Sequence, residues 1–500
     1  MGTVTGSWQQ TQYTIFTPLI IAGQHRPAST QETFDIRNPY TRKVVGTSAS
    51  ASSQDCNDAI TAAADAYKIW ENSPLSLRRE IFLRAAELAG SEKYKQKVIE
   101  TAQQETAASA GFSTGTWASG PNLLRTTASL VNELKGDSFP SGSVPGAQVV
   151  SQRRAMGVVL AISPWNAPYV LTLRAVAVPI LCGNTVVLKS SELSPRSQLV
   201  VVELFEEAGL PPGVLNFVSM SRETAPALTS EIIAHPAIRK INFTGSDRVG
   251  RILAGEAAKH LKPCVFELGG KAPFIVFEDA NVQEAAKSIA FTAMLHSGQV
   301  CMSTERVVVH SNVADALVSE VKSLCASLKA GDPVTDSAAK LSALFSEDSA
   351  KNIVGMIHEA VDQGATLALG DLALSGAVLQ PHLLTGVKPG MKIWERESFG
   401  PVVGFTTFET IDEAIELANA TEYSLSAAMW TTNVHTARDV APRIRAGYVN
   451  INGSTFHSEA YIGVAGLGGA SGYGRFDVEN FTDKRLIISH PPGRSYPEFF

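Results

Sequence analysis

The cysteine with the clearest chemical context is Cys301, which ends the glycine-containing turn Ser-Gly-Gln-Val-Cys at 297–301. The chain holds five cysteines, an odd number at irregular spacings, with no CxxC pair and no histidine at metal-ligand spacing. This pattern favours a reducing compartment and predicts no metal site. Most lone cysteines are small buried apolar residues, so Cys301 taken singly is packing more often than it is a nucleophile.

Three further polar side chains follow short β-branched runs of sequence. Asn166 stands between two prolines after the run 158–162, Lys189 follows the next such run, and Glu267 precedes Leu-Gly-Gly-Lys. Because α/β proteins bind ligands at the carboxyl ends of strands, we expect these residues at one edge of a sheet. Each also has an ordinary alternative: an Asn among prolines is usually a turn, and Lys189 with Glu192 could be a solvated ion pair.

A glycine-bearing turn, Phe-Thr-Gly-Ser-Asp-Arg-Val-Gly at 243–250, opens a helical pattern. Amide groups at the start of a helix can accept a phosphate. The turn is neither GxGxxG nor a P-loop, so as a nucleotide signal it is weak in isolation.

The elements that must position these residues alternate along the chain. Short β-branched runs predict strands at 158–162, 185–188, 214–218, 240–243, 274–277 and 306–310, and amphipathic runs predict helices at 169–181, 194–208, 225–234, 248–260, 282–296 and 313–328. This alternation is typical of parallel sheets covered by crossover helices, and it predicts two α/β domains. Helical spacing at 57–70, 77–90 and 92–105 makes the first third largely helical. The segment 135–152, rich in Gly, Ser and Pro, predicts a hairpin outside the main core.

Composition places the chain among soluble multi-domain proteins. Of the 500 residues, 44% are hydrophobic and 18% charged, with 39 Gly and 25 Pro, which excludes disordered or collagen-like chains. A net charge of −6, without a long basic run, predicts a small-molecule ligand and neither nucleic acid nor a membrane as partner. No apolar stretch has the length of a membrane span and no leader is evident, so we expect a cytoplasmic protein.

Seven motifs together resemble those of the aldehyde dehydrogenase superfamily. In the family's order, they are Pro-Trp-Asn at 164–166, Lys-Ser-Ser-Glu at 189–192, Phe-Thr-Gly-Ser at 243–246, Glu-Leu-Gly-Gly-Lys at 267–271, Gly-Gln-Val-Cys at 298–301, Glu-Ser-Phe-Gly-Pro at 397–401 and Asn-Gly at 452–453. Glu267 and Cys301 are 34 positions apart, which also matches the family. The segments 166–177, 183–193 and 301–306 look most like the branch of salicylaldehyde, vanillin and benzaldehyde dehydrogenases, which oxidises aromatic aldehydes.

The resemblance implies an α/β fold with a Rossmann-like NAD-binding domain, an α/β catalytic domain and a small β oligomerisation domain. On this chain the NAD-binding domain would comprise 1–134 and 154–266, the catalytic domain 267–462, and the oligomerisation arm 135–153 and 478–500. A strand arm with few core contacts of its own needs a partner chain, so we expect a homodimer or homotetramer.

The same resemblance implies the chemistry. Cys301 would be the nucleophile that attacks the aldehyde carbon as a thiolate. Asn166 would be the side-chain donor of an oxyanion hole, and Glu267 the base that activates water to hydrolyse the resulting thioester. The activity implied is NAD-dependent oxidation of an aldehyde to the carboxylic acid.

Further positions are implied to hold the cofactor. Glu192 would hydrogen-bond the adenosine ribose and repel a 2′-phosphate, which favours NAD over NADP. Ser246 would contact the pyrophosphate, while Glu397 and Phe399 would meet the nicotinamide ribose and ring. The complete cofactor set is Ser163, Pro164, Trp165, Lys189, Glu192, Gly245, Ser246, Gly250, Leu268, Gly269, Glu397 and Phe399.

Candidate substrate contacts follow Asn166 and Cys301 along the chain. Arg174 lies two helical turns beyond Asn166, where its guanidinium could bond a ring hydroxyl or carboxylate in the substrate tunnel or stack on the ring. A surface or interdomain salt bridge is the alternative for Arg174. Tyr169 and Met302 are further candidate pocket walls.

One segment departs from the aromatic branch. Residues 463–471 read Gly-Val-Ala-Gly-Leu-Gly-Gly-Ala-Ser and lack an aromatic residue that this branch usually carries. Val464 or Ala465 in its place predicts a wider pocket and a substrate larger than benzaldehyde.

Two other functions stay open from the sequence. One is a catalytically silent structural or binding member of the fold. Such a protein has no physical reason to keep all four of Cys301, Glu267, Asn166 and Glu192. The other is a CoA-acylating aldehyde dehydrogenase, which releases the thioester to a thiol instead of water. A cysteine hydrolase is disfavoured because no histidine fits as the paired base: His296 is five residues before Cys301, at the end of a predicted helix.

Overall fold

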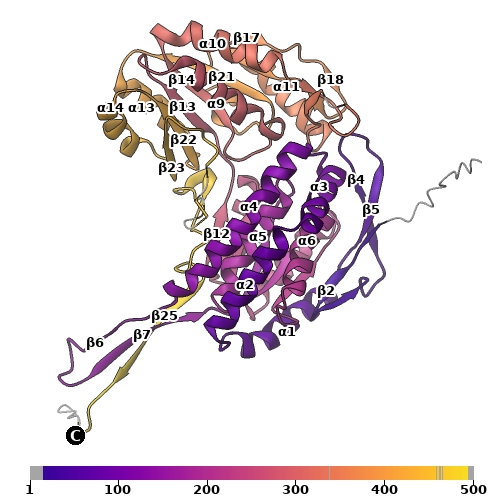
Figure 1. Ribbon diagram of the computed structural model, residues 1–500, viewed down its shortest axis with the longest axis vertical. Coiled ribbons are helices and arrows are strands. Elements are labelled where there is room, and N and C mark those ends of the chain that lie inside the picture. Colours follow the sequence, from indigo (N-terminus) through magenta and orange to yellow (C-terminus); the bar gives the residue numbers. More distant parts are fainter. Residues whose placement is uncertain (1–14, 337, 458, 461–462, 464, 494–500) are drawn as a thin grey trace, which may run out of the picture.

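The computed structural model describes residues 15–336, 338–457, 459–460, 463 and 465–493 (Figure 1). Two α/β units lie one above the other in this view, and a narrow arm of strands projects from the lower unit. The two α/β units expected from the alternating pattern are therefore confirmed.

The first unit is built on an eight-stranded sheet with the order β24-β12-β11-β8-β9-β10-β2-β3. Its strands are β2 (Leu19–Ile21), β3 (Gln24–Arg26), β8 (Val158–Ile162), β9 (Thr185–Lys189), β10 (Leu215–Val218), β11 (Ile238–Thr244), β12 (Cys264–Glu267) and β24 (Gly472–Tyr473). The five central strands run parallel, and the strands that flank them run antiparallel. Strands β8 and β9 are buried along their whole length, as expected for parallel strands covered on both faces.

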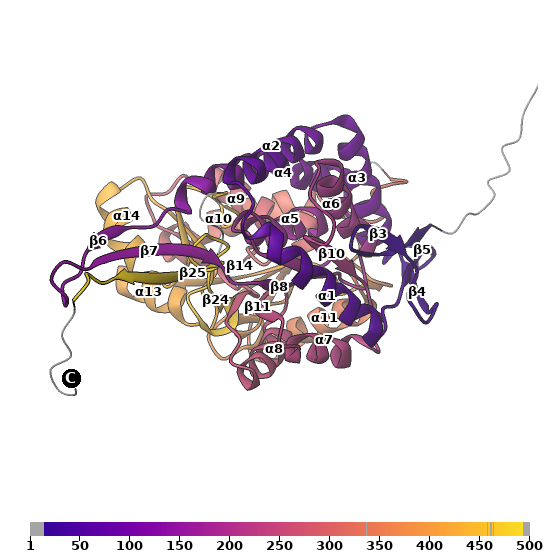
Figure 2. The same ribbon diagram turned by 90° about the horizontal axis from the view of Figure 1, so that it is seen from below.

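Helices cover both faces of this sheet (Figure 2). They are α1 (Ser53–Trp70), α2 (Leu75–Ala89), α3 (Glu92–Thr106), α4 (Ala110–Ser129), α5 (Pro168–Leu181), α6 (Pro195–Glu207), α7 (Ala225–Ala234) and α8 (Asp247–Lys259). Alternate residues of β8 enter two different cores: Val159 and Ala161 pack with α2, α5 and α6, whereas Leu160 and Ile162 pack with α1, α7 and α8. The two-residue period of the strand thus produces a core on each side.

The second unit has a seven-stranded sheet with the order β17-β20-β21-β14-β13-β22-β23. Its strands are β13 (Ala272–Val276), β14 (Thr304–His310), β17 (Thr366–Leu369), β20 (His382–Thr385), β21 (Val402–Phe408), β22 (Ser426–Trp430) and β23 (Tyr448–Ile451). Around it lie α9 (Val282–Met294), α10 (Ser311–Ala326), α11 (Glu347–Asp362), α12 (Lys392–Glu395), α13 (Ile411–Asn419) and α14 (Val434–Val440). Two small ribbons pair β15 (Lys329–Ala330) with β16 (Ala339–Leu341) and β18 (Leu374–Ser375) with β19 (Val378–Leu379).

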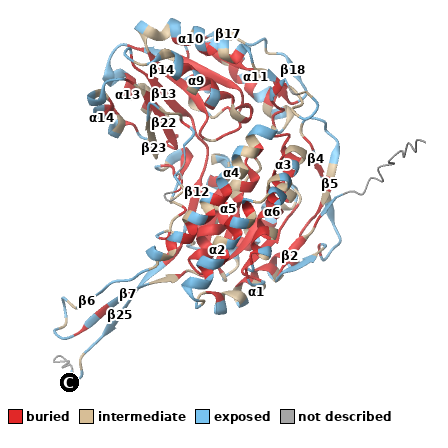
Figure 3. Ribbon diagram, viewed as in Figure 1, coloured by how far each residue is buried: buried red, intermediate tan, exposed pale blue. Residues whose placement is uncertain are grey.

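The arm is a three-stranded antiparallel sheet of β6 (Ser138–Pro140), β7 (Gln148–Ala155) and β25 (Thr482–Ser489). The predicted hairpin in 135–152 is therefore confirmed, with β25 as its additional strand. Most of the arm is exposed (Figure 3), including the consecutive apolar side chains Leu486, Ile487 and Ile488. None of the helices in the described ranges is long and apolar enough to cross a membrane.

Several elements were not anticipated from the sequence. A separate sheet of β1 (Phe16–Thr17), β4 (Thr33–Arg37) and β5 (Val44–Ala49) precedes the helices, and α4 follows α3. Helix α1 begins earlier than predicted because Ser52 and Asp55 form a capping box. The predicted helix 282–296 ends at Met294, since His296 and Ser297 adopt left-handed backbone angles.

Asn184 fixes the base of the arm to the first sheet. Its side chain is fully buried, and its Oδ1 accepts the N–H groups of Met156 at 2.8 Å and Gly157 at 3.1 Å. Its Nδ2 donates to the carbonyl groups of Pro179 at 3.0 Å and Phe481 at 2.8 Å. One amide therefore joins the start of β8, the end of α5 and the segment that leads into β25.

We expect Asn184→Ala to lower the free energy of unfolding by roughly 2–4 kcal/mol, because buried groups that lose their partners each cost about 1–3 kcal/mol. Urea unfolding followed by tryptophan fluorescence measures the change. Asn312→Ala, at an exposed position with one side-chain bond to Glu278, is the matched control. Equal midpoints for the two variants would contradict the role given to Asn184.

Candidate active site

Four parallel strands of the first sheet end along one edge, and polar residues singled out in the sequence lie at or just beyond those ends. The register pairs Ile162 of β8 with Lys189 of β9, and Thr244 of β11 with Glu267 of β12. The chain then crosses from β12 into β13 of the second unit through residues 268–271. The polar edge of the first sheet consequently faces the point where the two units are connected.

Cys301 lies against Glu267 at this crossing. The thiol donates a hydrogen bond to Oε1 of Glu267 across 3.1 Å. Two glycines make the approach possible: a Cβ at Gly270 would lie 1.9 Å from the carbonyl oxygen of Cys301, and one at Gly298 would lie 2.0 Å from that of Gly400. Gly298 also has a φ of +75°, which side chains rarely adopt. The turn before the cysteine therefore needs its glycine.

The surroundings of Cys301 favour the neutral thiol in the absence of substrate. Burial raises the pKa of Cys301 well above its ordinary value, and the charge and hydrogen bond of Glu267 raise that pKa further. The guanidinium of Arg174 acts in the opposite direction and lowers the pKa of Cys301. The sulfur thus has a proton to lose and a carboxyl group beside it that can take the proton.

Asn166 lies next to the cysteine turn. It is buried, with 5% of its surface exposed, and its Nδ2 donates to the carbonyl group of Gln299 at 3.0 Å. An amide nitrogen carries two N–H groups, so one remains in addition to the bond that positions the side chain. Asn166 is therefore bonded to the cysteine turn at Gln299, two residues before Cys301, and keeps a second side-chain N–H group as a donor.

Arg174 of α5 binds the second oxygen of Glu267. Its guanidinium forms an ion pair with Oε2 and donates to Oγ1 of Thr244 at 3.0 Å. It also stacks over the ring of Phe476, with its carbon 4.8 Å from the ring centroid. The structure places Arg174 as a neighbour of the carboxyl group of Glu267, so one oxygen of that group faces the sulfur and the other faces a cation.

The residues implied to hold the adenosine half of a dinucleotide lie on the same edge. Lys189 is 7% exposed, and its Nζ donates to the carbonyl group of Ser190 at 2.9 Å, while Glu192 is half-buried three residues later. Burial lowers the pKa of Lys189, and the nearby charge of Glu192 raises it. Ser163 and Pro164 accept hydrogen bonds from Gln198 through their carbonyl groups. The first turn after β8 is thereby tied to α6.

The residues implied for the phosphates surround the start of α8. Ser246 is the N-cap of this thirteen-residue helix, and Gly245 precedes it. A Cβ at Gly250 would lie 2.7 Å from the side chain of Leu268, so helix and crossing segment approach closely. A helix start beside tightly packed glycines suits a phosphate group. Lys189, Glu192 and the start of α8 thus provide a cation, a carboxylate and helix amide groups along one edge, and these groups fit a dinucleotide.

Glu397, Phe399 and Trp165 come together near the crossing. Oε1 of Glu397 accepts the N–H group of Gly270 at 2.8 Å, and a Cβ at Gly269 would lie 2.6 Å from Oε2 of the same carboxyl group. The rings of Trp165 and Phe399 meet edge to face with centroids 5.9 Å apart. Burial raises the pKa of Glu397 well above its usual range, and the charge of Glu305 raises it further.

An aromatic group beside the cysteine turn was not anticipated. The ring of His296 stacks on Phe112 with centroids 4.3 Å apart, and Trp165 contacts both His296 and Phe345. Burial lowers the pKa of His296 to about 4, so the ring is neutral at pH 7. Within the described ranges, the ring nitrogens of His296 have no hydrogen-bond partner.

The candidate pocket residues do not all lie near Cys301. Met302 belongs to a small apolar cluster with Val300 and Leu425, against which Cys301 packs. Tyr169 instead lies in the core of the first unit beneath α4, and its hydroxyl has no hydrogen-bond partner among the described residues. Ala465 is buried with its carbonyl oxygen against Gly447, whereas Val464 lies outside the described residues.

Two parts of the site had only weak sequence signals. The bond between Arg174 and Glu267 joins residues 93 positions apart, and no local pattern marks it. Glu305, which contacts the segment at 398–399, could have been noticed as the acidic residue four positions after Cys301. No group of three or more His, Cys, Asp or Glu in the described part of the chain is arranged to hold a metal ion.

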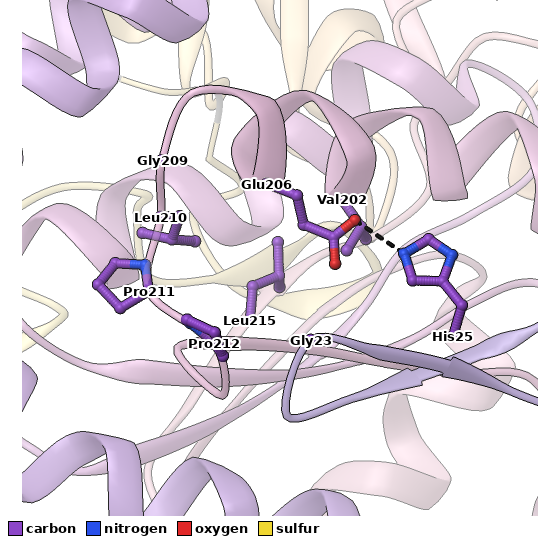
Figure 4. Close-up of a pocket in the computed structure, with 9 residues that line it drawn as sticks. All are labelled: Gly23, His25, Val202, Glu206, Gly209, Leu210, Pro211, Pro212 and Leu215. Carbon is purple, nitrogen blue, oxygen red and sulfur yellow. Dashed lines mark hydrogen bonds and ion pairs between the residues drawn. The ribbon is translucent and has the colours of Figure 1, made fainter.

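A pocket of about 500 Å³ lies elsewhere on the first unit (Figure 4). It is lined by the turn between β2 and β3, the end of α6 and the loop 209–215, and His25 bridges to Glu206 at 3.0 Å. This loop leads into the amino end of β10, whereas the residues described above follow the carboxyl ends of strands. None of the residues predicted for the site lines this pocket.

Comparison with known proteins finds relatives along nearly the whole chain. Residues 25–488 match the aldehyde dehydrogenase family. A vanillin dehydrogenase of Pseudomonas fluorescens is 40% identical over 484 residues, which cover 96% of this chain and 99% of the relative. The crystal structure of a salicylaldehyde dehydrogenase from Pseudomonas putida G7 complexed with salicylaldehyde matches with a TM-score of 0.92 at 37% identity, covering 97% of this chain and 100% of that chain. A succinate-semialdehyde dehydrogenase (NADP+) of Deinococcus radiodurans is 33% identical over 490 residues, 95% of this chain and 97% of the relative.

The electrostatics around Cys301 predict opposite effects of two substitutions on its reactivity. Glu267→Gln removes a charge that raises the pKa of Cys301, so more thiolate forms and iodoacetamide reacts faster at a fixed pH of about 8. Arg174→Gln removes a charge that lowers this pKa, so the reaction slows. Mass spectrometry of the peptide that contains Cys301 gives the rates across a pH series.

Cys264 is the internal control in the same samples. It is partly exposed, and burial raises its pKa to about 11, with Lys240 as its charged neighbour. Its rate should be the same in all three proteins. Shifts of the Cys301 profile in one direction for both substitutions would contradict the arrangement described here.

Proposed function

The chain belongs to the aldehyde dehydrogenase family, and from this premise we propose that it oxidises an aromatic aldehyde to the carboxylic acid with NAD as the hydride acceptor. Members of this family use a nicotinamide cofactor. The observation that carries the proposal is the 3.1 Å contact between Cys301 and Glu267, with Asn166 hydrogen-bonded to the turn that ends at Cys301. A nucleophile, a base and an oxyanion donor are the groups that this reaction requires.

Cys301 is proposed to attack the carbonyl carbon of the aldehyde. A carbon–sulfur bond forms, the carbonyl oxygen becomes negative, and the thiol proton passes to Oε1 of Glu267. The raised pKa of Cys301 supports this coupling, because a thiol that holds its proton at rest needs a neighbouring base at the moment of attack. Asn166 is proposed to donate its second N–H group to the developing oxyanion.

The cofactor residues are proposed to act as the resemblance implies. Lys189 and Glu192 would hold the adenosine ribose, Ser246 the pyrophosphate, and Glu397 the nicotinamide ribose. When bound, the nicotinamide ring supplies the hydride acceptor. The half-buried carboxyl group of Glu192 supports NAD as the cofactor, because a 2′-phosphate would meet its negative charge.

Oxidation of the bound substrate carbon leaves a thioester on Cys301, which water must cleave. Glu267 is proposed to accept the proton of this water while Arg174 remains on its other oxygen. The position of Glu267 beside the sulfur supports hydrolysis over transfer to CoA, since a base at that place serves a water molecule directly.

An aromatic substrate is supported by the relatives and by the side chains near Cys301. The relatives include a vanillin dehydrogenase and a salicylaldehyde dehydrogenase complexed with salicylaldehyde. Phe112, Leu295 and Tyr448 pack with Cys301 against the apolar cluster of Val300, Met302 and Leu425. Rings and aliphatic groups around a nucleophile suit an aromatic aldehyde. We further propose that Val464 or Ala465, which stands where this branch usually carries an aromatic residue, admits substrates larger than benzaldehyde.

The domain roles are proposed along the same lines. Residues 1–134 and 154–266 would bind NAD, 267–462 would carry the catalytic cysteine, and 135–153 with 478–500 would join the chain into a homodimer or homotetramer. The exposed run of apolar side chains on β25 supports the last role, because such a strand needs a cover.

An aldehyde panel from aliphatic to polycyclic, run with NAD and NADP, tests the activity. We expect NADH formation with aromatic aldehydes, no NADH formation in Cys301→Ala, and a roughly 100- to 1000-fold lower turnover in Asn166→Ala, because one oxyanion donor contributes about 3–4 kcal/mol. The acid should form in equal amounts with and without CoA.

Cys264→Ala is the control for the loss of a thiol, since Cys264 is half-buried at the start of β12 and its thiol donates to the carbonyl group of Lys262 at 3.6 Å. Equal NADH formation by wild type and Cys301→Ala would show that the protein is a catalytically silent member of the fold. An acyl-CoA product would show the CoA-acylating reaction. A preference for benzaldehyde over bulky aldehydes in kcat/KM would contradict the wider pocket.

Glu192→Ala tests the cofactor choice. The substitution removes both a hydrogen bond to a charged group and a repulsive charge, so the ratio of kcat/KM with NAD to that with NADP should fall by at least about tenfold. Glu223→Ala, at a fully exposed acidic residue before α7, is the matched control. An unchanged ratio of kcat/KM with NAD to that with NADP would mean that Glu192 does not contact the adenosine ribose.

A further inference from the structure

The segment Glu397–Phe399 is held by a carboxylate that the proposed reaction does not use. Glu305, in β14, accepts the N–H group of Ser398 with both oxygens, at 2.9 Å and 3.1 Å. Its Oε1 also accepts the N–H group of Phe399 at 3.3 Å. Phe399 has a φ of +54°, which a residue with a side chain rarely adopts. The backbone here is therefore shaped around the carboxylate.

The charge of Glu305 is matched inside the protein by Lys271. Their side chains are 3% and 1% exposed, and Nζ of Lys271 donates to Oε2 of Glu305. Arg306 fixes the backbone of the same lysine, because its Nε donates to the carbonyl group of Lys271 at 3.0 Å. Burying two charges is expensive, and a buried ion pair is weak evidence for stability alone.

The same contacts tie the segment to the cysteine. Glu305 is four residues after Cys301, and Lys271 is four residues after Glu267. The N–H group of Gly270 donates to Glu397 at 2.8 Å, so the crossing segment contacts 397–399 twice, once directly and once through Glu305. A shift of Glu305 would move Glu397 and Phe399 relative to the sulfur.

We propose that Glu305, paired with Lys271, is a positioning residue that holds Glu397 and Phe399 against the nicotinamide half of the cofactor in register with Cys301. The inference rests on the proposed function, in which these two residues meet the nicotinamide ribose and ring. It assigns Glu305 and Lys271 no contact with the substrate. Their effect is transmitted through the backbone amides of Ser398 and Phe399.

The double variant Lys271→Met/Glu305→Gln tests the inference without leaving one buried charge unpaired, which would be strongly destabilising. Glu305→Asp, which keeps the charge but shortens the side chain, is the second variant. Glu284→Gln/Lys287→Met is the matched control, because this exposed pair of the same residue types is joined at 2.9 Å on α9. All proteins are studied as the full chain.

Three measurements separate positioning from general damage. Calorimetric titration compares the affinity for NAD with that for AMP, which lacks the nicotinamide half. Oxidation of benzaldehyde with deuterium at the aldehyde carbon reports how far hydride transfer limits the rate. Hydrolysis of p-nitrophenyl acetate without cofactor reports the reactivity of Cys301 alone.

In the double variant we expect NAD affinity to fall by about tenfold, the effect of one hydrogen bond to a charged group, while AMP affinity is unchanged. The deuterium isotope effect should rise above that of wild type, and ester hydrolysis should stay within about twofold. Glu305→Asp should shift the same quantities in the same direction by less, and the control pair should match wild type.

Unchanged NAD affinity and isotope effect in both variants would overturn the inference. Equal losses of NAD and AMP binding, or a parallel loss of ester hydrolysis, would also overturn it, because Glu305 would then support the fold as a whole. Failure of the wild type to bind NAD or form NADH would overturn the proposed function itself, and the inference with it.

Discussion

The carboxyl group of Glu267 lies between a thiol and a guanidinium, and much of the fold serves to keep it there. Oε1 accepts from Cys301, whereas Oε2 binds Arg174. These three residues come from a strand end of the first sheet, the turn before β14 of the second sheet, and helix α5. Such an arrangement requires both α/β units to be fixed relative to each other at 268–271. The glycines at 270 and 298 let the backbone segments meet closely enough.

Three buried or half-buried carboxyl groups lie in the same region, and each has a partner that offsets its charge or donates a hydrogen bond to it. Glu267 has Arg174 as its partner and Glu305 has Lys271, while Glu397 is held by the N–H group of Gly270. Carboxylates without such partners would repel one another. Burial raises the pKa of Glu397, and the charge of Glu305 raises it further. The paired cations therefore permit three carboxyl groups near one sulfur, and they also orient the backbone that carries those groups.

The sequence predicted the elements better than the contacts between them. The strand 158–162 and the helix 225–234 were predicted with their observed bounds, because apolar periodicity and turn residues mark them locally. The order of motifs and the spacing of Glu267 and Cys301 identified the groups that the crossing brings together. The bond of Arg174 to Glu267 had no local signal, since it depends on how α5 packs beneath the sheet edge. The left-handed turn at His296 likewise ended a helix that periodicity alone would continue.

The two carboxyl oxygens of Glu267 have different partners, and this limits how the proposed reaction can proceed. Its Oε2 is occupied by Arg174, so in the proposed reaction Oε1 would have to serve both the thiol of Cys301 and the water that would cleave the thioester. One oxygen cannot hold both protons, so the first proton must leave the carboxyl group before hydrolysis begins. Arg174 donates to Oε2, so its guanidinium leaves Oε1 to the thiol and then to the water. Holding Oε2 also keeps Oε1 directed at the sulfur, so one side chain can serve the nucleophile first and the water afterwards without leaving its place at the end of β12.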